Sequence, residues 1–172
     1  QNSAGNSVII KQGTGSTVTI PNGGIKMVAT DGAGSGGAVT DVLDVTGGTG
    51  NIGLGSGSLG TGLTTGTDNV AIGENAGDAL TTGSDNTLVG DNAGGALTTG
   101  TDNIAIGSAA LDAEDTGARS VAIGSNALSA QNNDANNYNV AVGYNSGAAA
   151  TSGIRNNFFG AESGEALTTG DD

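Results

Sequence analysis

Short apolar runs recur at a nearly constant interval along the chain from residue 51 onward. Each run places two large residues around a central one, as in Val70-Ala71-Ile72 and Val140-Ala141-Val142. A glycine closes each run, and successive closing glycines are 18, 17, 17, 17, 19 and 17 residues apart. These glycines are Gly55, Gly73, Gly90, Gly107, Gly124, Gly143 and Gly160. Because each copy of a repeat array forms one structural unit that stacks on the next, this interval predicts seven stacked copies.

The three residues of each run are expected to form a short strand, in which alternate side chains point to opposite faces. A strand that is apolar on both faces needs cover on both. We assign the outer residues to the core of the repeat: Val70, Ile72, Ile104, Ile106, Val121, Ile123, Val140 and Val142. The central residues then lie on the other face, where we expect them to contact neighbouring chains: Ala71, Leu88, Ala105, Ala122, Ala141 and Phe158.

The glycine after each strand predicts a sharp turn, because a positive φ is nearly free of strain only for glycine. The expected turn residues are Gly73, Gly90, Gly107, Gly124, Gly143 and Gly160. Seven or eight residues after the glycine, four copies carry a leucine, as at Leu80 and Leu97. Where Glu114 or Gln131 takes this position, Leu111 or Leu128 appears three residues earlier. In these two copies we therefore expect the earlier leucine to fill the core volume that the missing leucine would have filled.

These patterns predict an all-β fold in two parts. Residues 51–172 are expected to form a parallel β-roll or β-helix, assembled as a trimer, with strands about 4.8 Å apart. Residues 1–50 lack the repeat and contain β-type runs around residues 8–10, 18–20, 25–28 and 42–45, separated by turn residues. This segment is expected to be a small β module that joins or caps the rod. Fifty residues make a marginal core, so contacts within a trimer or with the rod end should complete it.

Polar residues also fall into columns when the copies are stacked. Asparagine recurs before each strand, interrupted only by Ser120, which predicts a ladder of amide hydrogen bonds. Asp68, Asp85 and Asp102 precede this column, and such side chains commonly bond the backbone of a turn. A weak Ca²⁺ site at these three carboxylates is the alternative, and no other metal or cofactor is expected. The same column places Arg119 beside Asp102 and Arg155 beside Asp172, as exposed pairs that contribute little.

Composition narrows the classes of partner and activity. The 172 residues carry a formal net charge of −13, from 17 acidic and 4 basic side chains. Phosphate backbones and anionic membranes need Lys or Arg to neutralise them, so we expect neither nucleic acid nor membrane as a partner. Cysteine and histidine are absent, which excludes thiol catalysis and the usual zinc sites. Since the chain begins at Gln1 rather than Met, we expect a piece of a longer protein.

We expect no enzyme activity and no catalytic residue. A polysaccharide hydrolase would require a carboxylate pair, for which Glu114, Asp115 and Glu162 are the candidates. Aromatic residues make up only 2% of the chain, and short rungs cannot wall a deep cleft, so this alternative is disfavoured. Paired threonines such as Thr81-Thr82 suggest an ice-binding face, but three middle copies lack the pair.

Three segments carry a family resemblance: SVAIGSNAL (120–128), NVAIGENAG (69–77) and NVAVGYNSG (139–147). They resemble the head repeats of YadA-like trimeric autotransporter adhesins, and the resemblance covers residues 51–172. It implies a left-handed parallel β-roll in which three chains pack around a common axis. The chain departs from that family in its longer rung and in its ALTTGxDN turn, which leaves the exact winding open.

A second resemblance rests on the ALTTGSDNTLVG repeat (79–90) and on STVTIPNGGIKMVATDGAG (16–34) followed by VTDVLDV (39–45). These segments are similar to fibre and other virion structural proteins of tailed bacteriophages, notably marine and cyanobacterial ones. The likeness implies a rigid rod on a virion, extracellular, that contributes to host attachment. The implied partners are copies of the same chain, other virion or fibre proteins, and a host-surface glycan or protein. The candidate contact residues are those where the repeat is broken, at 131–138 and Tyr144, and the alternative is that these positions are surface loops with no binding role. The alternative location is a bacterial cell surface.

Overall fold

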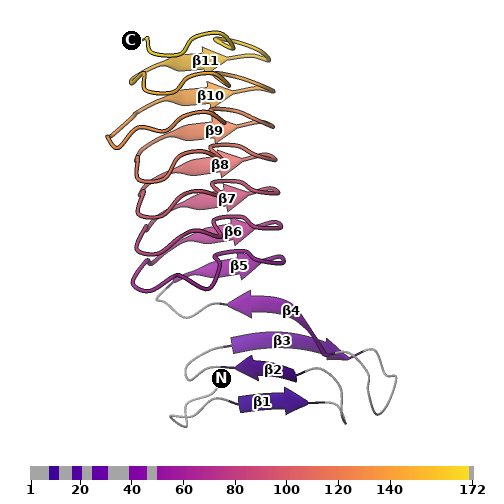
Figure 1. Cartoon of the computed structure of the whole chain (residues 1–172). Coiled ribbons are helices and arrows are strands. Elements are labelled where there is room, and N and C mark those ends of the chain that lie inside the picture. Colours follow the sequence, from indigo (N-terminus) through magenta and orange to yellow (C-terminus); the bar gives the residue numbers. More distant parts are fainter. Residues whose placement is uncertain (1–7, 12–16, 21–24, 31–38, 46–49, 171–172) are drawn as a thin grey trace.

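The computed structural model describes residues 8–11, 17–20, 25–30, 39–45 and 50–170, and it describes side chains from residue 50 onward. This part of the chain contains eleven β-strands and no helix. Figure 1 shows the strands lying one above another, so that the molecule is a rod with the C-terminus at one end. Within the described residues there is accordingly no helix of the length and apolarity needed to cross a membrane.

Four antiparallel strands lie at the N-terminal end of the rod. They are β1 (Val8–Lys11), β2 (Thr17–Ile20), β3 (Ile25–Thr30) and β4 (Val39–Val45). β1 pairs with β2 and β3 pairs with β4, at the positions where the sequence predicts β-type runs. β4 also pairs with β5 (Ile52–Leu54), which begins the stack (Figure 1). The division into domains 1–50 and 51–172 stays a prediction, and the pairing changes from antiparallel to parallel at β5.

Seven short parallel strands form the stack. After β5 come β6 (Val70–Ile72), β7 (Thr87–Val89), β8 (Ile104–Ile106), β9 (Val121–Ile123), β10 (Val140–Val142) and β11 (Asn157–Phe159). Each strand pairs with the next in register, so that equivalent residues of successive copies lie side by side. The sheet order runs from β11 to β3 without a crossover. The fold is therefore a parallel β-solenoid with turns of about 17 residues, which confirms the predicted all-β stack of repeats, and the trimer stays a prediction.

The glycine that follows each strand adopts a positive φ, as expected for the turn. The values lie between 111° and 142° for Gly73, Gly90, Gly107, Gly124, Gly143 and Gly160. Close approach of the backbones is a second reason for glycine at this position. A Cβ atom on Gly73 would lie 2.3 Å from the carbonyl oxygen of Gly90, its equivalent in the next turn. The column therefore lets neighbouring turns stack at the short separation that strand pairing requires.

The interior of the solenoid is lined by the central residue of each strand. Ala71, Leu88, Ala105, Ala122, Ala141 and Phe158 are all buried. The prediction that this column contacts other chains is wrong, because each of these side chains is enclosed by its own chain. The column predicted as core lies on the outside instead. Val70, Ile104, Val121, Val140 and Val142 are half-buried, and Ile72, Ile106 and Ile123 are exposed.

The thinness of the solenoid explains this reversal. Leucines from the part of the turn opposite the strand already fill the interior, and Leu80, Leu97, Leu111 and Leu128 are fully buried. The strand can then contribute mostly small side chains to the same space. Alternation along a strand shows that its two faces differ, but it does not show which face is enclosed. The larger Val and Ile side chains are therefore the ones that face outward.

Large and small residues complement one another inside the stack. Leu88 fills the space beside Gly77 and Gly94, since a Cβ on either glycine would lie within 3 Å of the leucine. Phe158 occupies the corresponding space beside Gly147 and Gly164. Where the strand carries Ala105 or Ala122, Leu111 or Leu128 stands at the position of these glycines, and both leucines are buried. The expected compensation of core volume is thus present in the structure.

Candidate functional site

The outward face of the sheet is the first candidate for contact with a partner. Its side chains are the outer residues of each strand, and none of them is charged. They are Ile52, Leu54, Val70, Ile72, Thr87, Val89, Ile104, Ile106, Val121, Ile123, Val140, Val142, Asn157 and Phe159. In-register pairing aligns them into two straight columns, which we call the outer apolar face. At the usual strand separation the seven strands give this face a height of roughly 30 Å.

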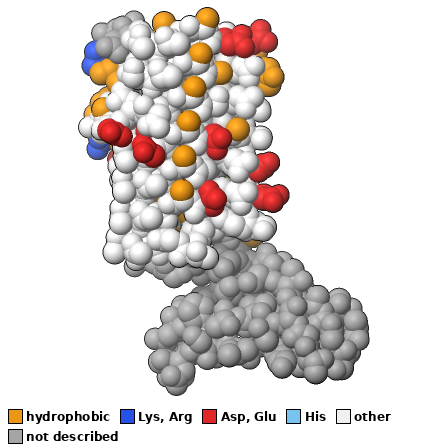
Figure 2. Space-filling view, in the orientation of Figure 1, with side chains coloured by type: hydrophobic (Ala, Val, Ile, Leu, Met, Phe, Trp, Pro, Cys, Tyr) orange, Lys and Arg blue, Asp and Glu red, His pale blue; other side chains and the backbone are white. Residues whose placement is uncertain are grey.

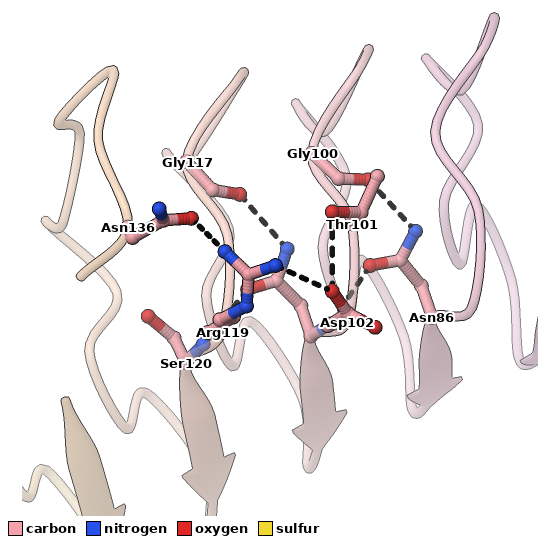
Figure 3. Close-up of polar contacts among 9 residues, drawn as sticks. Asn86, Gly100, Thr101, Asp102, Gly117, Arg119, Ser120 and Asn136 are labelled. Atoms are coloured by element: carbon pink, nitrogen blue, oxygen red, sulfur yellow. Dashed lines mark hydrogen bonds and ion pairs between the residues drawn. The ribbon is translucent and has the colours of Figure 1, made fainter. Parts of the chain in front are cut away.

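A ladder of buried asparagines runs along the inside edge of the strands, as predicted. The Asn69 N–H donates to Asn51 Oδ1 at 2.9 Å, and the Asn86 N–H donates to Asn69 Oδ1 at 3.1 Å. Each amide nitrogen also donates to a glycine carbonyl across the turn, as from Asn86 to Gly100 at 2.9 Å (Figure 3). The ladder therefore pairs polar backbone groups that the thin core would otherwise leave without partners.

The ladder changes partners at Ser120, where asparagine is missing. The Ser120 N–H still donates to Asn103 Oδ1 at 3.0 Å. Gln131 replaces the missing amide: its Nε2 donates to Ser120 Oγ at 2.8 Å, and its Oε1 accepts from Asn139 Nδ2 at 2.7 Å. The ladder then continues, because the Asn156 N–H donates to Asn139 Oδ1 at 2.8 Å. A polar residue in a leucine position thus keeps the hydrogen bonding continuous through the break.

Glu114 is the second polar residue in a leucine position, and it is completely buried. Its Oε1 accepts from the N–H of Gly117 at 2.8 Å and from the N–H of Asn133 at 3.4 Å. Its Oε2 accepts from Gln131 Nε2 and Asn137 Nδ2, both at 2.9 Å. Desolvation by burial raises the pKa of Glu114 above its ordinary value, against the lowering effect of these hydrogen bonds.

Above this buried network the surface carries an arginine and a tyrosine. Arg119 lies between Asp102 and Asn136, as Figure 3 shows. Its Nη2 is 3.5 Å from Asp102 Oδ2, and its Nη1 donates to Asn136 Oδ1. The guanidinium carbon is 6.0 Å from the centroid of the Tyr138 ring. The predicted Arg119–Asp102 pair is confirmed, whereas Asp172, the expected partner of Arg155, lies outside the described residues.

Tyr138 and Tyr144 are the two tyrosines of the chain, and both side chains are exposed, at 50% and 53%. Tyr138 is the last residue of the predicted contact segment 131–138, and Tyr144 follows β10 by two residues. Residues 132–136 of this segment include four exposed residues, two of them asparagine. Exposed tyrosine and asparagine side chains supply stacking and hydrogen bonds at many recognition surfaces, which keeps the predicted contact region 131–138 a candidate.

Acidic side chains are distributed along the rod rather than gathered in one pocket. Figure 2 shows them scattered over the visible face, while the basic side chains lie at one edge. Partial burial and the nearby Asp78 and Asp91 raise the pKa of Asp112. Asp68, Asp85 and Asp102 are exposed, with φ of 58–60°. No group of three or more His, Cys, Asp or Glu side chains in the described part of the chain is arranged to hold a metal ion. Asp68, Asp85 and Asp102 therefore do not form the carboxylate cluster that the predicted Ca²⁺ alternative would need.

The candidate catalytic acids are not presented as a pair at the surface. Glu114 has no exposed surface, so its carboxylate cannot contact a sugar polymer. Glu162 is exposed in the turn that follows β11, three turns away from the turn of Glu114. Three strand separations correspond to about 14 Å along the rod, which exceeds the spacing of a glycosidase carboxylate pair. The hydrolase alternative thus finds no geometric support among these residues.

The threonine pairs contribute hydrogen bonds along the rod. Thr64 Oγ1 donates to the Thr81 carbonyl at 3.1 Å, and Thr81 Oγ1 donates to the Thr98 carbonyl at 3.1 Å. Thr98 Oγ1 donates to the Asp115 carbonyl at 3.0 Å, and the threonine column stops at Asp115. These hydroxyls therefore help to hold adjacent turns together, and the column that an ice-binding face would need is interrupted.

The fold places the described residues 50–170 in the class of parallel β-solenoids. Comparison with protein-family models, with curated proteins and with solved structures finds no match for the chain.

Proposed function

We propose that the chain is a rigid structural segment of an extracellular fibre, assembled from three copies of itself. The observation that carries this proposal is the outer apolar face, which has no charged side chain over the seven strands of the stack and only Thr87 and Asn157 as polar members. Exposed, contiguous apolar surface on a soluble protein usually marks a site of association. Three rods that turn this face toward a common axis would remove it from water and leave the acidic turns outside.

The internal bonding of the stack supports a mechanical role. In-register strand pairing, the asparagine ladder and the threonine hydroxyls all run along the rod axis. Such a rod resists bending and holds its surface groups at defined positions. We assign it to a virion appendage such as a tail fibre, where it contributes to host attachment together with other virion or fibre proteins. The alternative is the head segment of a trimeric adhesin on a bacterial cell surface.

Attachment would use the surface where the repeat is broken. Tyr138 and Tyr144 are exposed there, and the buried Glu114 network holds the segment 132–136 from the inside. A host-surface glycan or protein is the partner class that this combination fits, because aromatic and amide side chains suit polyhydroxylated ligands as well as peptide surfaces. Three copies on one fibre would bind multivalently, so weak single contacts would still hold the particle.

Engineered cysteines test the assembly directly, since the native chain has none. Ile106→Cys places a thiol in the middle of the outer apolar face, where a side chain is 37% exposed. Thr99→Cys places one on an exposed position of the turn instead. Under mild oxidation we expect covalent dimers from Ile106→Cys and unlinked chains from Thr99→Cys. Equal cross-linking of the two variants, or none in either, would contradict assembly through this face.

A further inference from the structure

A buried polar cluster links the turn of Glu114 to the 19-residue turn that follows it, and the proton chemistry of this cluster is separate from the fibre proposal. Glu114, Gln131 and Asn137 are all fully buried, beside the asparagine ladder and the cluster of buried Leu, Ala and Phe side chains. A buried carboxylate is costly unless hydrogen bonds or an opposite charge compensate it. The chemistry of this cluster therefore depends on which groups face the carboxylate.

The groups that bond Glu114 carry no charge. They are the backbone N–H groups of Gly117 and Asn133 and the side-chain amides of Gln131 and Asn137. The ionisable group that acts on Glu114 is Asp115, and its like charge also raises the pKa of Glu114.

The other charged residues near this turn are Arg119, Asp134 and Arg155, whose backbone N–H donates to the Asn137 carbonyl at 2.8 Å, and none of the three is among the groups that shift the pKa of Glu114. Arg119 pairs with Asp102, and Asp134 accepts a hydrogen bond from the Thr116 hydroxyl at 2.6 Å. Among the described residues, Glu114 thus has hydrogen-bond donors but no cationic partner.

Asn137 is incompletely bonded in this arrangement. Its Nδ2 donates to Glu114 Oε2, whereas its Oδ1 is the one buried side-chain polar atom of the described residues that has no partner. An ionised carboxylate can only accept hydrogen bonds, so it holds the amide nitrogen toward itself. A protonated carboxyl group can donate, and it would then favour the amide oxygen in the same place.

We propose that Glu114 and Asn137 form a proton switch inside the rod. Glu114 takes up one proton from solvent, its new O–H donates to Asn137 Oδ1, and the Asn137 amide turns over to accept it. Asn133 and Asn137 flank the surface segment 134–136, and both bond Glu114, so the switch adjusts the anchoring of this segment. The proposal is independent of fibre assembly, because every group in it belongs to one chain.

The sign of the stability effect follows from linkage. Since the folded chain binds the proton more tightly than the unfolded chain, protonation of Glu114 stabilises the fold. This contribution is fully present below the ordinary value of 4.5 and is lost as the pH rises through the higher pKa of the folded state. Acidification through that window therefore strengthens the turn of Glu114.

Carbon NMR of the glutamate carboxyl groups tests the switch on the intact chain, which contains four glutamates. The resonance that disappears in Glu114→Gln is assigned to Glu114. We expect it to titrate with a midpoint above 4.5, and we expect the side-chain amide of Asn137 to shift with the same midpoint. Asp115→Asn removes a like charge and should lower that midpoint.

Two variants complete the experiment. In Glu114→Gln the pH response of the Asn137 amide should disappear, whereas in Glu162→Gln, which changes an exposed glutamate, it should persist. A midpoint at or below 4.5 for Glu114 in the wild-type chain would overturn the proposal. An Asn137 side-chain amide whose chemical shift does not change as Glu114 titrates would overturn it as well. If Glu114→Gln does not fold, single Gln variants of the three exposed glutamates, Glu74, Glu162 and Glu165, assign the remaining resonance to Glu114, and both readouts then come from the wild-type chain.

Discussion

Leu88→Ala is the substitution that tests the packing of the solenoid most sharply. Leu88 is fully buried and fills the space beside Gly77 and Gly94, which have no side chains that could move into a cavity. Leucine-to-alanine substitutions in protein cores cost about 2–5 kcal/mol, and the cost is highest where the surroundings cannot relax. We therefore expect Leu88→Ala to lower the free energy of unfolding by about 3–4 kcal/mol.

Gly94→Ala supplies the second arm of a double-mutant cycle. Gly94 has a φ of +58°, and an added Cβ would lie 2.8 Å from Leu88 Cδ2. The left-handed conformation costs an L-residue about 1 kcal/mol, and overpacking against the leucine should add about 1 kcal/mol more. In the Leu88→Ala background only the conformational cost remains. The two substitutions should therefore couple by about 1 kcal/mol, with the double variant more stable than the sum predicts.

Urea unfolding followed by circular dichroism measures these energies. Gly147→Ala is the matched control, because its Cβ would meet Phe158 rather than Leu88, at 2.7 Å. It should be additive with Leu88→Ala. The packing account would be refuted if Leu88→Ala cost less than about 1 kcal/mol, well below the range for a buried leucine. Equal costs of Gly94→Ala in both backgrounds would refute it as well.

Three further predictions use the same unfolding assay. Asn103→Ala should cost about 3 kcal/mol, because it leaves a buried serine N–H and a buried glycine carbonyl without their partners; a cost below about 1 kcal/mol would show that the ladder is dispensable. Arg119→Ala should change stability by less than about 0.5 kcal/mol, because exposed ion pairs contribute little; a large loss would contradict that. Partial burial and the nearby Asp78 and Asp91 raise the pKa of Asp112, so this ionised carboxylate opposes folding at neutral pH. Asp112→Asn should therefore raise the urea midpoint at pH 7 and not at pH 3, and an equal effect at both would exclude ionisation of Asp112 as the cause.

The stacking of the chain could be predicted from the sequence because it depends on the repeat interval. Equivalent residues must meet when copies of about 17 residues stack in register, so the asparagine ladder and the glycine turns follow from position alone. The compensation of core volume by Leu111 and Leu128 could be read in the same way, since both leucines are buried as the pattern required.

The assignment of the two strand faces could not be predicted in this way. Val and Ile are larger and more apolar than Ala, so burial of the larger column is the ordinary expectation. In this fold the interior is a narrow space that already holds leucines from the turns, and the small column fits it. The burial of Glu114 was also missed, although its place in the leucine column was the signal: a polar residue at a core position needs buried partners.

Light scattering of the purified chain tests the central claim, that this solenoid is a rod of three copies joined through the outer apolar face. The account predicts a solution mass near three times the 16.2 kDa of one chain. It also predicts that Ile106→Lys and Ile123→Lys together return the mass to that of one chain without loss of the β signal in circular dichroism. A wild-type mass of 16.2 kDa at high protein concentration would contradict the account and leave a single-chain solenoid whose apolar face is free.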